Sequence, residues 1–127
     1  MKFTRLKNNF EDDRGIIRDI LTQVKFDAAT IITSAKGATR ANHFHKDTIQ
    51  WTYILKGKVQ YLYQKEGEDT KEVLLEEGDV VRSDVKEAHA LTALEDSSLL
   101  ILTRGPRNGE EYESDTFRLD TPLSLSK

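Results

Sequence analysis

Residues 37–57 read GATRANHFHKDTIQWTYILKG, and two histidines, His43 and His45, stand near their centre. Successive side chains of a β-strand point to opposite faces, so residues at positions i and i+2 share one face. The segment therefore predicts a strand that presents two imidazole rings to the same space. Gln50 follows five residues after His45.

Short runs of β-branched and aromatic residues continue on both sides of this segment, separated by glycine and charged turns, whereas helical periodicity is weak. Gly57-Lys58 predicts a tight turn between two strands. We expect strands over residues 15–21, 30–34, 42–45, 49–55, 58–64, 72–75, 80–83, 88–93 and 98–103. Strands spaced this regularly without helical spacers predict an all-β fold, either a sandwich or a small barrel.

The length of 127 residues suits one compact domain. We expect a single domain over residues 1–127, with a core of about 15–104 and a polar C-terminal extension over 105–127. The extension is expected to lie over the barrel surface and to fray after Pro122. The sequence leaves open whether residues 112–119 pack on their own barrel or on a partner subunit.

The charge balance and the absence of cysteine exclude several classes of function. Lys plus Arg number 19 and Asp plus Glu number 22, a formal charge of −3, so no basic excess favours nucleic acid as a partner. The absence of Cys removes disulfides, thiolate metal sites, iron–sulfur clusters and cysteine nucleophiles. No apolar run has the length of a membrane span, and no signal peptide is visible. We therefore expect a cytoplasmic protein without a membrane partner.

The three histidines of the chain are the strongest chemical signal, and the third, His89, lies on a separate expected strand. Three imidazoles and the amide oxygen of Gln50 converging inside a barrel would bind a divalent transition metal: Zn, Fe, Mn, Ni or Cu. An uncharged ligand set leaves the ion its full charge, which strengthens its pull on an enolate oxygen. In the alternatives, Gln50 forms hydrogen bonds without touching an ion, or the histidines serve substrate binding or proton transfer without metal.

The spacing of these residues supplies a second, more specific signal. The first part of the frame comprises Gly37, His43, His45, Gln50 and Gly57, and the second part comprises Gly78 and His89. This frame resembles the two-part signature of the cupin superfamily, which implies a double-stranded β-helix, or jelly-roll, barrel. The cupin pattern usually has Glu at Gln50, and Pro, Gly and Asn at Asp84, Lys86 and Ala93. The second part therefore retains only its glycine and its histidine.

A narrower resemblance covers residues 40–46, Arg-Ala-Asn-His-Phe-His-Lys, together with Gln50. It resembles the Arg-Gly-x-His-x-His-Lys-x-x-x-Gln stretch of nucleotide-sugar 3,4-ketoisomerases, and its Arg-x-x-His-Phe part is similar to the RmlC-like dTDP-sugar 3,5-epimerases. The resemblance implies that Arg40 contacts a diphosphate and that His43 or His45 is the base. Arg suits this role because its planar fork matches phosphate oxygens. Alternatively, Arg40 is a surface salt-bridge residue. The ketoisomerases do not depend on a metal, whereas His89 completes a metal set here.

Four aromatic residues on the neighbouring strands extend the candidate site. Tyr61 and Tyr63 share one face and either line the mouth of the barrel, as substrate-binding residues, or fill its interior. Trp51 and Tyr53 lie on the face opposite Gln50, so we expect them in sheet packing or a dimer contact. The superfamily resemblance also implies a homodimer.

Three functions from different classes follow from these residues. The first is a metal-dependent isomerase, epimerase or tautomerase that moves a proton on a carbohydrate or nucleotide-sugar. The same ligand set is similar to that of small metal cupins that open or tautomerise unsaturated uronates. The second is an iron-dependent dioxygenase, and the third is a non-catalytic cupin that binds a small ligand. A barrel fold by itself does not choose among them.

Overall fold

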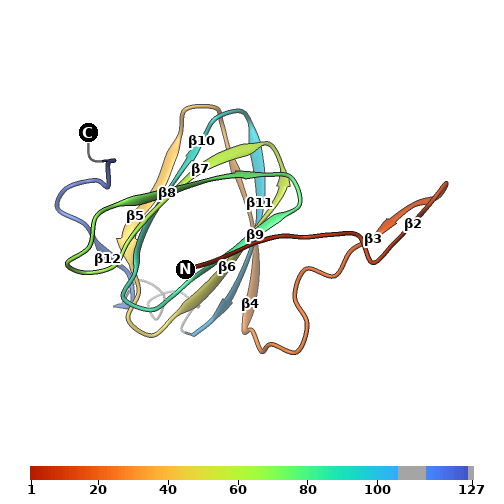
Figure 1. Cartoon of the computed structure of the whole chain (residues 1–127). Coiled ribbons are helices and arrows are strands. Elements are labelled where there is room, and N and C mark those ends of the chain that lie inside the picture. The colour runs from red at the N-terminus through yellow and green to blue at the C-terminus, as the bar shows by residue number, and fades with distance from the viewer. Residues whose placement is uncertain (106–113, 126–127) are drawn as a thin grey trace.

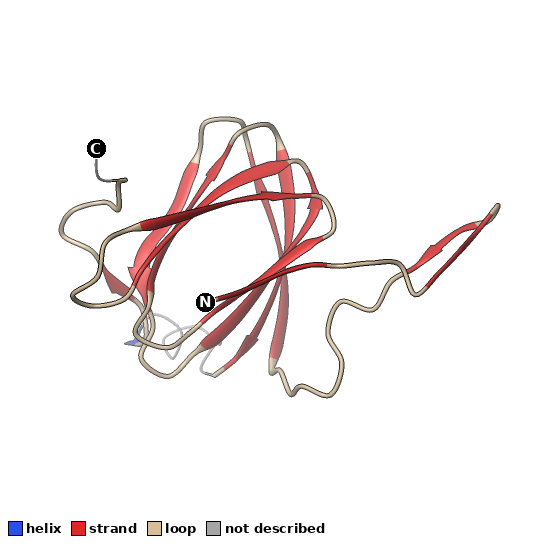
Figure 2. Ribbon diagram, in the orientation of Figure 1, coloured by secondary structure: helices blue, strands red, loops and turns tan. Residues whose placement is uncertain are grey.

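The computed structural model of the chain describes residues 1–105 and 114–125. The described residues form twelve strands and no long helix (Figures 1 and 2). The strands are β1 (Lys2–Arg5), β2 (Phe10–Asp12), β3 (Gly15–Ile17), β4 (Ala28–Ser34), β5 (Thr39–Phe44), β6 (Ile49–Lys56), β7 (Lys58–Gln64), β8 (Lys71–Glu76), β9 (Asp79–Ser83), β10 (Ala88–Ala93), β11 (Ser97–Arg104) and β12 (Phe117–Arg118). Within this part of the chain, no helix is long and apolar enough to cross a membrane.

Two five-stranded antiparallel sheets build the barrel. One has the order β1-β9-β6-β11-β4 and the other the order β12-β5-β10-β7-β8. Consecutive strands such as β4 and β5, or β5 and β6, belong to different sheets, so the chain winds repeatedly between the two layers (Figure 1). This arrangement confirms the expected all-β jelly roll.

The interior of the barrel is apolar over most of its length and polar in one region. The apolar cluster contains Ile54, Val59, Tyr61, Leu75, Val81, Leu91, Leu99 and Ile101. Burying one such aliphatic side chain stabilises the fold by about 1.5–3 kcal/mol. The polar region includes a cross-strand row in which Gln50 pairs with Ser83 on one side and Thr103 on the other, all three buried.

A second apolar cluster covers the outer face of the first sheet. Trp51 and Tyr53 are only 7% and 8% exposed there, because Leu6, Ile20 and Leu21 pack against their cluster. The expectation of sheet packing for these two aromatics is therefore confirmed. Their face is covered by the N-terminal part of the same chain and does not form an open contact surface.

The N-terminal region departs from the expected strand over residues 15–21. Only Gly15–Ile17 forms a strand, β3, which pairs with β2 in a hairpin that extends away from the barrel (Figure 1). The hairpin residues Phe10, Ile16 and Ile17 are 50%, 49% and 60% exposed. Their apolar character indicated a strand, but the sequence did not show that this strand lies outside the core. None of β1, β2 and β12 was expected.

Two turn residues, Gly57 and Lys86, have left-handed backbone conformations. Gly57, in the turn from β6 to β7, has a φ of 99°, and a β-carbon there would collide with Ser97 and the carbonyl oxygen of Asp96. Lys86, between β9 and β10, has a φ of 63°, a left-handed conformation that costs a residue with a β-carbon about 1–2 kcal/mol. The cupin pattern usually has glycine at this position.

We predict that Lys86→Gly raises the free energy of unfolding, measured by urea denaturation, by about 0.5–1 kcal/mol. Glycine removes the strain of the left-handed backbone, but its greater entropy in the unfolded chain offsets part of this gain. Lys86 is exposed, so little packing is lost. Lys86→Ala is the matched control, because it removes the side chain but keeps the β-carbon. Equal stabilisation in both variants would show that the left-handed backbone is not the cause.

Candidate functional site

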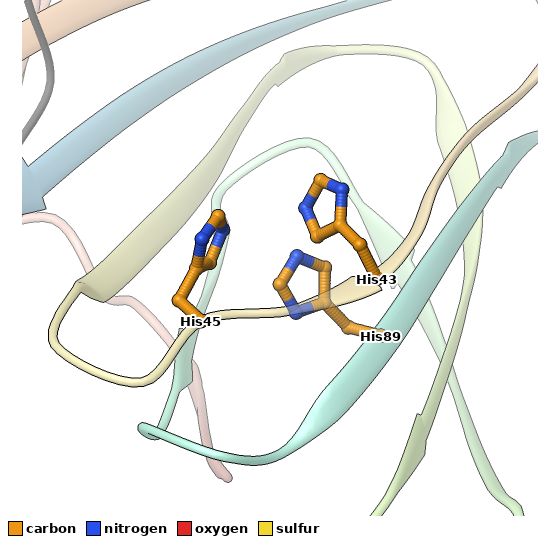
Figure 3. Close-up of side chains that lie close together, drawn as sticks. All are labelled: His43, His45 and His89. Atoms are coloured by element: carbon orange, nitrogen blue, oxygen red, sulfur yellow. The ribbon is translucent and has the colours of Figure 1, made fainter. Parts of the chain in front are cut away.

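The structure brings the three histidines together in the barrel interior (Figure 3). His43 lies on β5, His45 follows directly after it, and His89 lies on β10 opposite His43. Their ring centroids are 4.7 Å (His43–His45), 4.8 Å (His43–His89) and 5.7 Å (His45–His89) apart. One nitrogen from each ring lies within 4.8 Å of the others, and the three residues are 8%, 2% and 1% exposed. The three histidines therefore lie close together, as the sequence predicts.

A β-bulge next to His43 sets the relative position of the rings. The register between β5 and β10 shifts after His89, so that His89 faces His43 while Ala90 faces Ala41. The extra residue is Asn42, and both Ala41 and Asn42 have left-handed φ values of 74° and 54°. Bulges re-aim side chains and concentrate near functional sites. Non-glycine residues in this conformation store strain that the surrounding structure must offset.

Several ring nitrogens of the cluster lack the partners that buried polar atoms normally have. Among the described residues, Nδ1 of His43 forms no hydrogen bond, and neither nitrogen of His89 forms one of good geometry, although the backbone of Glu87 contacts this ring. A buried polar atom without a partner costs about 1–3 kcal/mol, and native proteins retain few of them. Such a cost at one place points to a ligand that supplies the missing contacts.

The protonation of these rings suits a cation or a proton acceptor. Burial, assisted by the neighbouring His45 and Arg118, lowers the pKa of His43 to about 4. Burial together with the charges of His43 and His45 lowers the pKa of His89 to about 3. Both rings are therefore neutral at pH 7, and each carries a nitrogen lone pair.

His45 is held by a contact typical of metal-binding histidines. Its Nδ1 lies 2.9 Å from the backbone oxygen of Asp115. A carbonyl oxygen only accepts, so Nδ1 carries the proton and Nε2 presents its lone pair. Histidines that ligate metals commonly donate their other ring N–H to a carbonyl or carboxylate in this way. The neutral rings of His43 and His89 and the Nδ1 contact of His45 therefore fit a divalent transition metal.

The environment of Gln50 is compatible with either of its two expected roles. It is 7% exposed, and its Nε2 donates to Oγ1 of Thr52 over 3.2 Å. The amide oxygen is not used in that bond and is the atom that would reach an ion. Thr103 on the adjacent strand has a buried hydroxyl without a hydrogen-bond partner among the described residues.

The two tyrosines lie at different depths. Tyr61 is fully buried, stacks on His89 at 6.2 Å with an interplanar angle of 9°, and its hydroxyl forms a hydrogen bond with Ser83. Burial raises the pKa of Tyr61 well above its ordinary value, so its hydroxyl stays protonated. Tyr63 lines a pocket of about 210 Å³ together with Met1 and Glu87. Tyr61 thus fills the interior, whereas Tyr63 reaches its edge.

Arg40 on β5 is bound by the end of β4, a strand of the other sheet. Its guanidinium donates to Oγ of Ser34 and to the carbonyl oxygen of Thr33, each over 2.8 Å. Among the described contacts, none joins Arg40 to the histidines. A different cationic residue, Arg118 on β12, lies directly opposite His43 on β5 in the strand register. Residues directly opposite on paired strands project to the same face, so Arg118 lies beside the cluster.

The described part of the C-terminal extension packs on its own barrel. The β12 strand pairs with β5, and Phe117 stacks on Phe44 with ring centroids 5.2 Å apart. Of the segment 112–119, residues 112–113 lie outside the described residues. The extension supplies Asp115 and Arg118 to the site, and sequence reasoning assigned neither a role. The strand that carries Arg118 has only two residues, Phe117 and Arg118, which is too short for a pattern that predicts a strand.

The carboxylate of Asp115 holds the loop that follows His45. It accepts hydrogen bonds from the amide of Lys46 at 3.0 Å, the amide of Asp47 at 3.1 Å and the hydroxyl of Thr48 at 2.6 Å. Burial alone would raise the pKa of Asp115, but these hydrogen bonds and the charge of His45 outweigh it and lower the pKa. The carboxylate is therefore ionised at neutral pH.

A jelly-roll barrel with a histidine cluster in its polar region is the cupin-type fold that the sequence predicts. The model of the polysaccharide biosynthesis C-terminal domain family matches residues 10–117, and the chain belongs to this family. A search of curated proteins finds no match.

Solved structures of the same fold include two sugar isomerases and an epimerase. QdtA, a sugar 3,4-ketoisomerase from Thermoanaerobacterium thermosaccharolyticum in complex with TDP, is 20% identical over 94% of this chain and 88% of its own, with a TM-score of 0.78. A 3,4-ketoisomerase from Helicobacter canadensis is 17% identical over 93% and 90%, with a TM-score of 0.80. The rmlC epimerase of Mycobacterium tuberculosis is 18% identical over 98% and 78%, with a TM-score of 0.78. These similarities confirm the RmlC-like cupin fold.

Proposed function

We propose that the protein isomerises or epimerises a nucleotide-sugar by moving a proton at a carbon adjacent to a ketone. The observation that carries the proposal is the buried histidine cluster with unpartnered ring nitrogens. The substrate class is supported by the similar structures, which are named as sugar 3,4-ketoisomerases and an epimerase. The family description, polysaccharide biosynthesis, agrees with sugar-nucleotide chemistry.

The reaction needs a base, a stabilised oxyanion and a site for returning the proton. A neutral imidazole, His43 or His45, removes the hydrogen next to the ketone, and the carbonyl oxygen takes up the electron pair to give an enediolate. The imidazolium then returns the proton. Delivery to the former carbonyl carbon, with transfer of the hydroxyl proton to the other oxygen, moves the ketone. Inversion of the original carbon instead takes a proton from solvent on the opposite face, and the imidazolium then releases its proton to solvent.

We also propose that the cluster binds a divalent transition metal through His43, His45 and His89, with Gln50 as the fourth ligand. The support is the neutral state of the His43 and His89 rings and the donor bond from His45 to Asp115. When bound, such an ion polarises the substrate carbonyl as a Lewis acid. A ring that ligates the ion through its lone pair does not act as base. Whichever of His43 and His45 removes the proton would therefore leave the ion to the other two histidines and Gln50.

The test of the isomerase proposal is the incorporation of solvent deuterium into TDP-4-keto-6-deoxyglucose, followed by proton NMR in D₂O. Loss of the C3 proton signal alone is expected for a ketoisomerase, and loss at C3 and C5 for a 3,5-epimerase, because each reaction removes those protons. TDP-glucose, which has no ketone, is the control and should not exchange. Tight binding of the keto-sugar without any exchange above the rate in buffer would contradict catalysis and favour a binding protein.

A further inference from the structure

We propose that Asp115 is a positioning residue for the candidate site: its carboxylate anchors the loop after His45 so that its own backbone oxygen fixes the tautomer of the His45 ring. This inference deepens the proposed function, because the orientation of His45 matters both for proton transfer and for metal binding. It concerns the C-terminal extension, which the cupin frame of residues 37–103 does not include.

The contacts of Asp115 join two parts of the chain far apart in sequence. The residue is 4% exposed, and its carboxylate binds residues 46–48, which lie 67 to 69 positions earlier. These contacts occupy both carboxylate oxygens, since Oδ1 accepts from two amides and Oδ2 accepts from Thr48. The same residue therefore binds the loop through its side chain and the His45 ring through its main chain.

This double attachment has a chemical consequence for His45. A neutral imidazole exists as two tautomers, and a carbonyl oxygen at Nδ1 stabilises the form whose Nε2 is unprotonated. The carbonyl can select this form only while Asp115 stays in place. The hydrogen bonds from the loop to an ionised carboxylate supply that restraint, since bonds to charged groups are the stronger ones.

Local pairing adds a second restraint that keeps the segment at the site. β12 begins two residues after Asp115 and pairs with β5, and the amide of Leu119 donates to the carbonyl oxygen of Asn42 over 2.9 Å. The segment is thus bound to residues that precede His45 in the sequence and to residues that follow it. Loss of the Asp115 carboxylate should loosen the contact at His45 without detaching β12.

The test compares Asp115→Ala, Asp115→Asn and Asp120→Asn in the full chain. Asp120 is an exposed carboxylate of the same extension and serves as the matched control. The first readout is the His45 tautomer in metal-free protein, measured by ¹⁵N NMR of the imidazole nitrogens. The second readout is the affinity for Zn²⁺, measured by competition with a chelating dye.

We expect the control to match the wild type in both readouts. Asp115→Ala should convert His45 from the Nδ1–H form to a mixture of tautomers and weaken Zn²⁺ binding about 10–100-fold, the range typical of partners that orient metal ligands. Asp115→Asn retains one acceptor oxygen and should show a smaller change in both. Thr48→Val, which removes a single bond to the carboxylate, provides a milder variant in case Asp115→Ala does not fold.

A loss of thermal stability with an unchanged tautomer and unchanged Zn²⁺ affinity, in whichever of these variants folds, would overturn the proposal and leave Asp115 a purely structural residue. The tautomer measurement uses neither substrate nor metal. An absence of isomerase activity would therefore contradict the proposed function without contradicting the role of Asp115.

Discussion

The substitution His89→Leu is expected to abolish both metal binding and deuterium exchange without destabilising the metal-free protein. The His89 ring is 1% exposed, and among the described residues neither of its nitrogens forms a hydrogen bond of good geometry, although the backbone of Glu87 contacts the ring. Leucine fills a similar volume and removes both unpartnered atoms, each of which costs about 1–3 kcal/mol. Metal affinity should fall by more than the roughly 10–100-fold typical of outer partners, because a ligand itself is lost.

The matched control is Leu91→Ala, two residues further along β10 in the apolar cluster. It creates a cavity and should lower the free energy of unfolding by about 2–5 kcal/mol while metal affinity is retained. Urea denaturation in the presence of a chelator and titration with Zn²⁺ separate the two effects. If His89→Leu lost several kcal/mol of stability and still bound metal, His89 would be a structural residue and the proposed site would be wrong.

The histidine cluster could be predicted because its geometry depends on local alternation and on a fixed spacing. His43 and His45 share a face of one strand by the period of the β-structure, and the cupin frame predicted that His89 would join them. The inward and outward faces around Trp51 follow from the same alternation. What the sequence does not show is the bulge at Asn42, since no glycine marks its left-handed backbone.

The contribution of the C-terminal extension could not be predicted, because its contacts are non-local and its strand is short. Asp115 binds a loop almost 70 positions earlier, and no periodic pattern around it indicates this partner. Arg40 illustrates the opposite difficulty. Its local motif implied a diphosphate contact, whereas Ser34 and Thr33 accept its hydrogen bonds in the folded chain. The role of an arginine depends on what surrounds it in space.

Arg118→Ala is expected to weaken the binding of TDP about 10–100-fold in isothermal titration calorimetry. Arg118 is exposed, and its side chain projects to the same face of the sheet as that of His43, which lies opposite it on β5. Its charge also contributes to the lowered pKa of His43. A hydrogen bond to a charged group is worth about 1.5–3 kcal/mol, which gives that range. Arg118→Lys should restore only part of the affinity, because an ammonium group lacks the bidentate fork that matches phosphate oxygens.

The comparison that decides the assignment is Arg40→Ala, in which the second candidate for the diphosphate is removed. If Arg118 binds the anion, Arg40→Ala should change TDP affinity by less than about 3-fold and should mainly lower stability, since it loses the bonds to Ser34 and Thr33. Affinity lost in Arg40→Ala and retained in Arg118→Ala would instead support the role that the ketoisomerase resemblance implies. Added salt should weaken binding to wild type and to the variant that retains the contact, because screening reduces the attraction between an exposed guanidinium and a diphosphate.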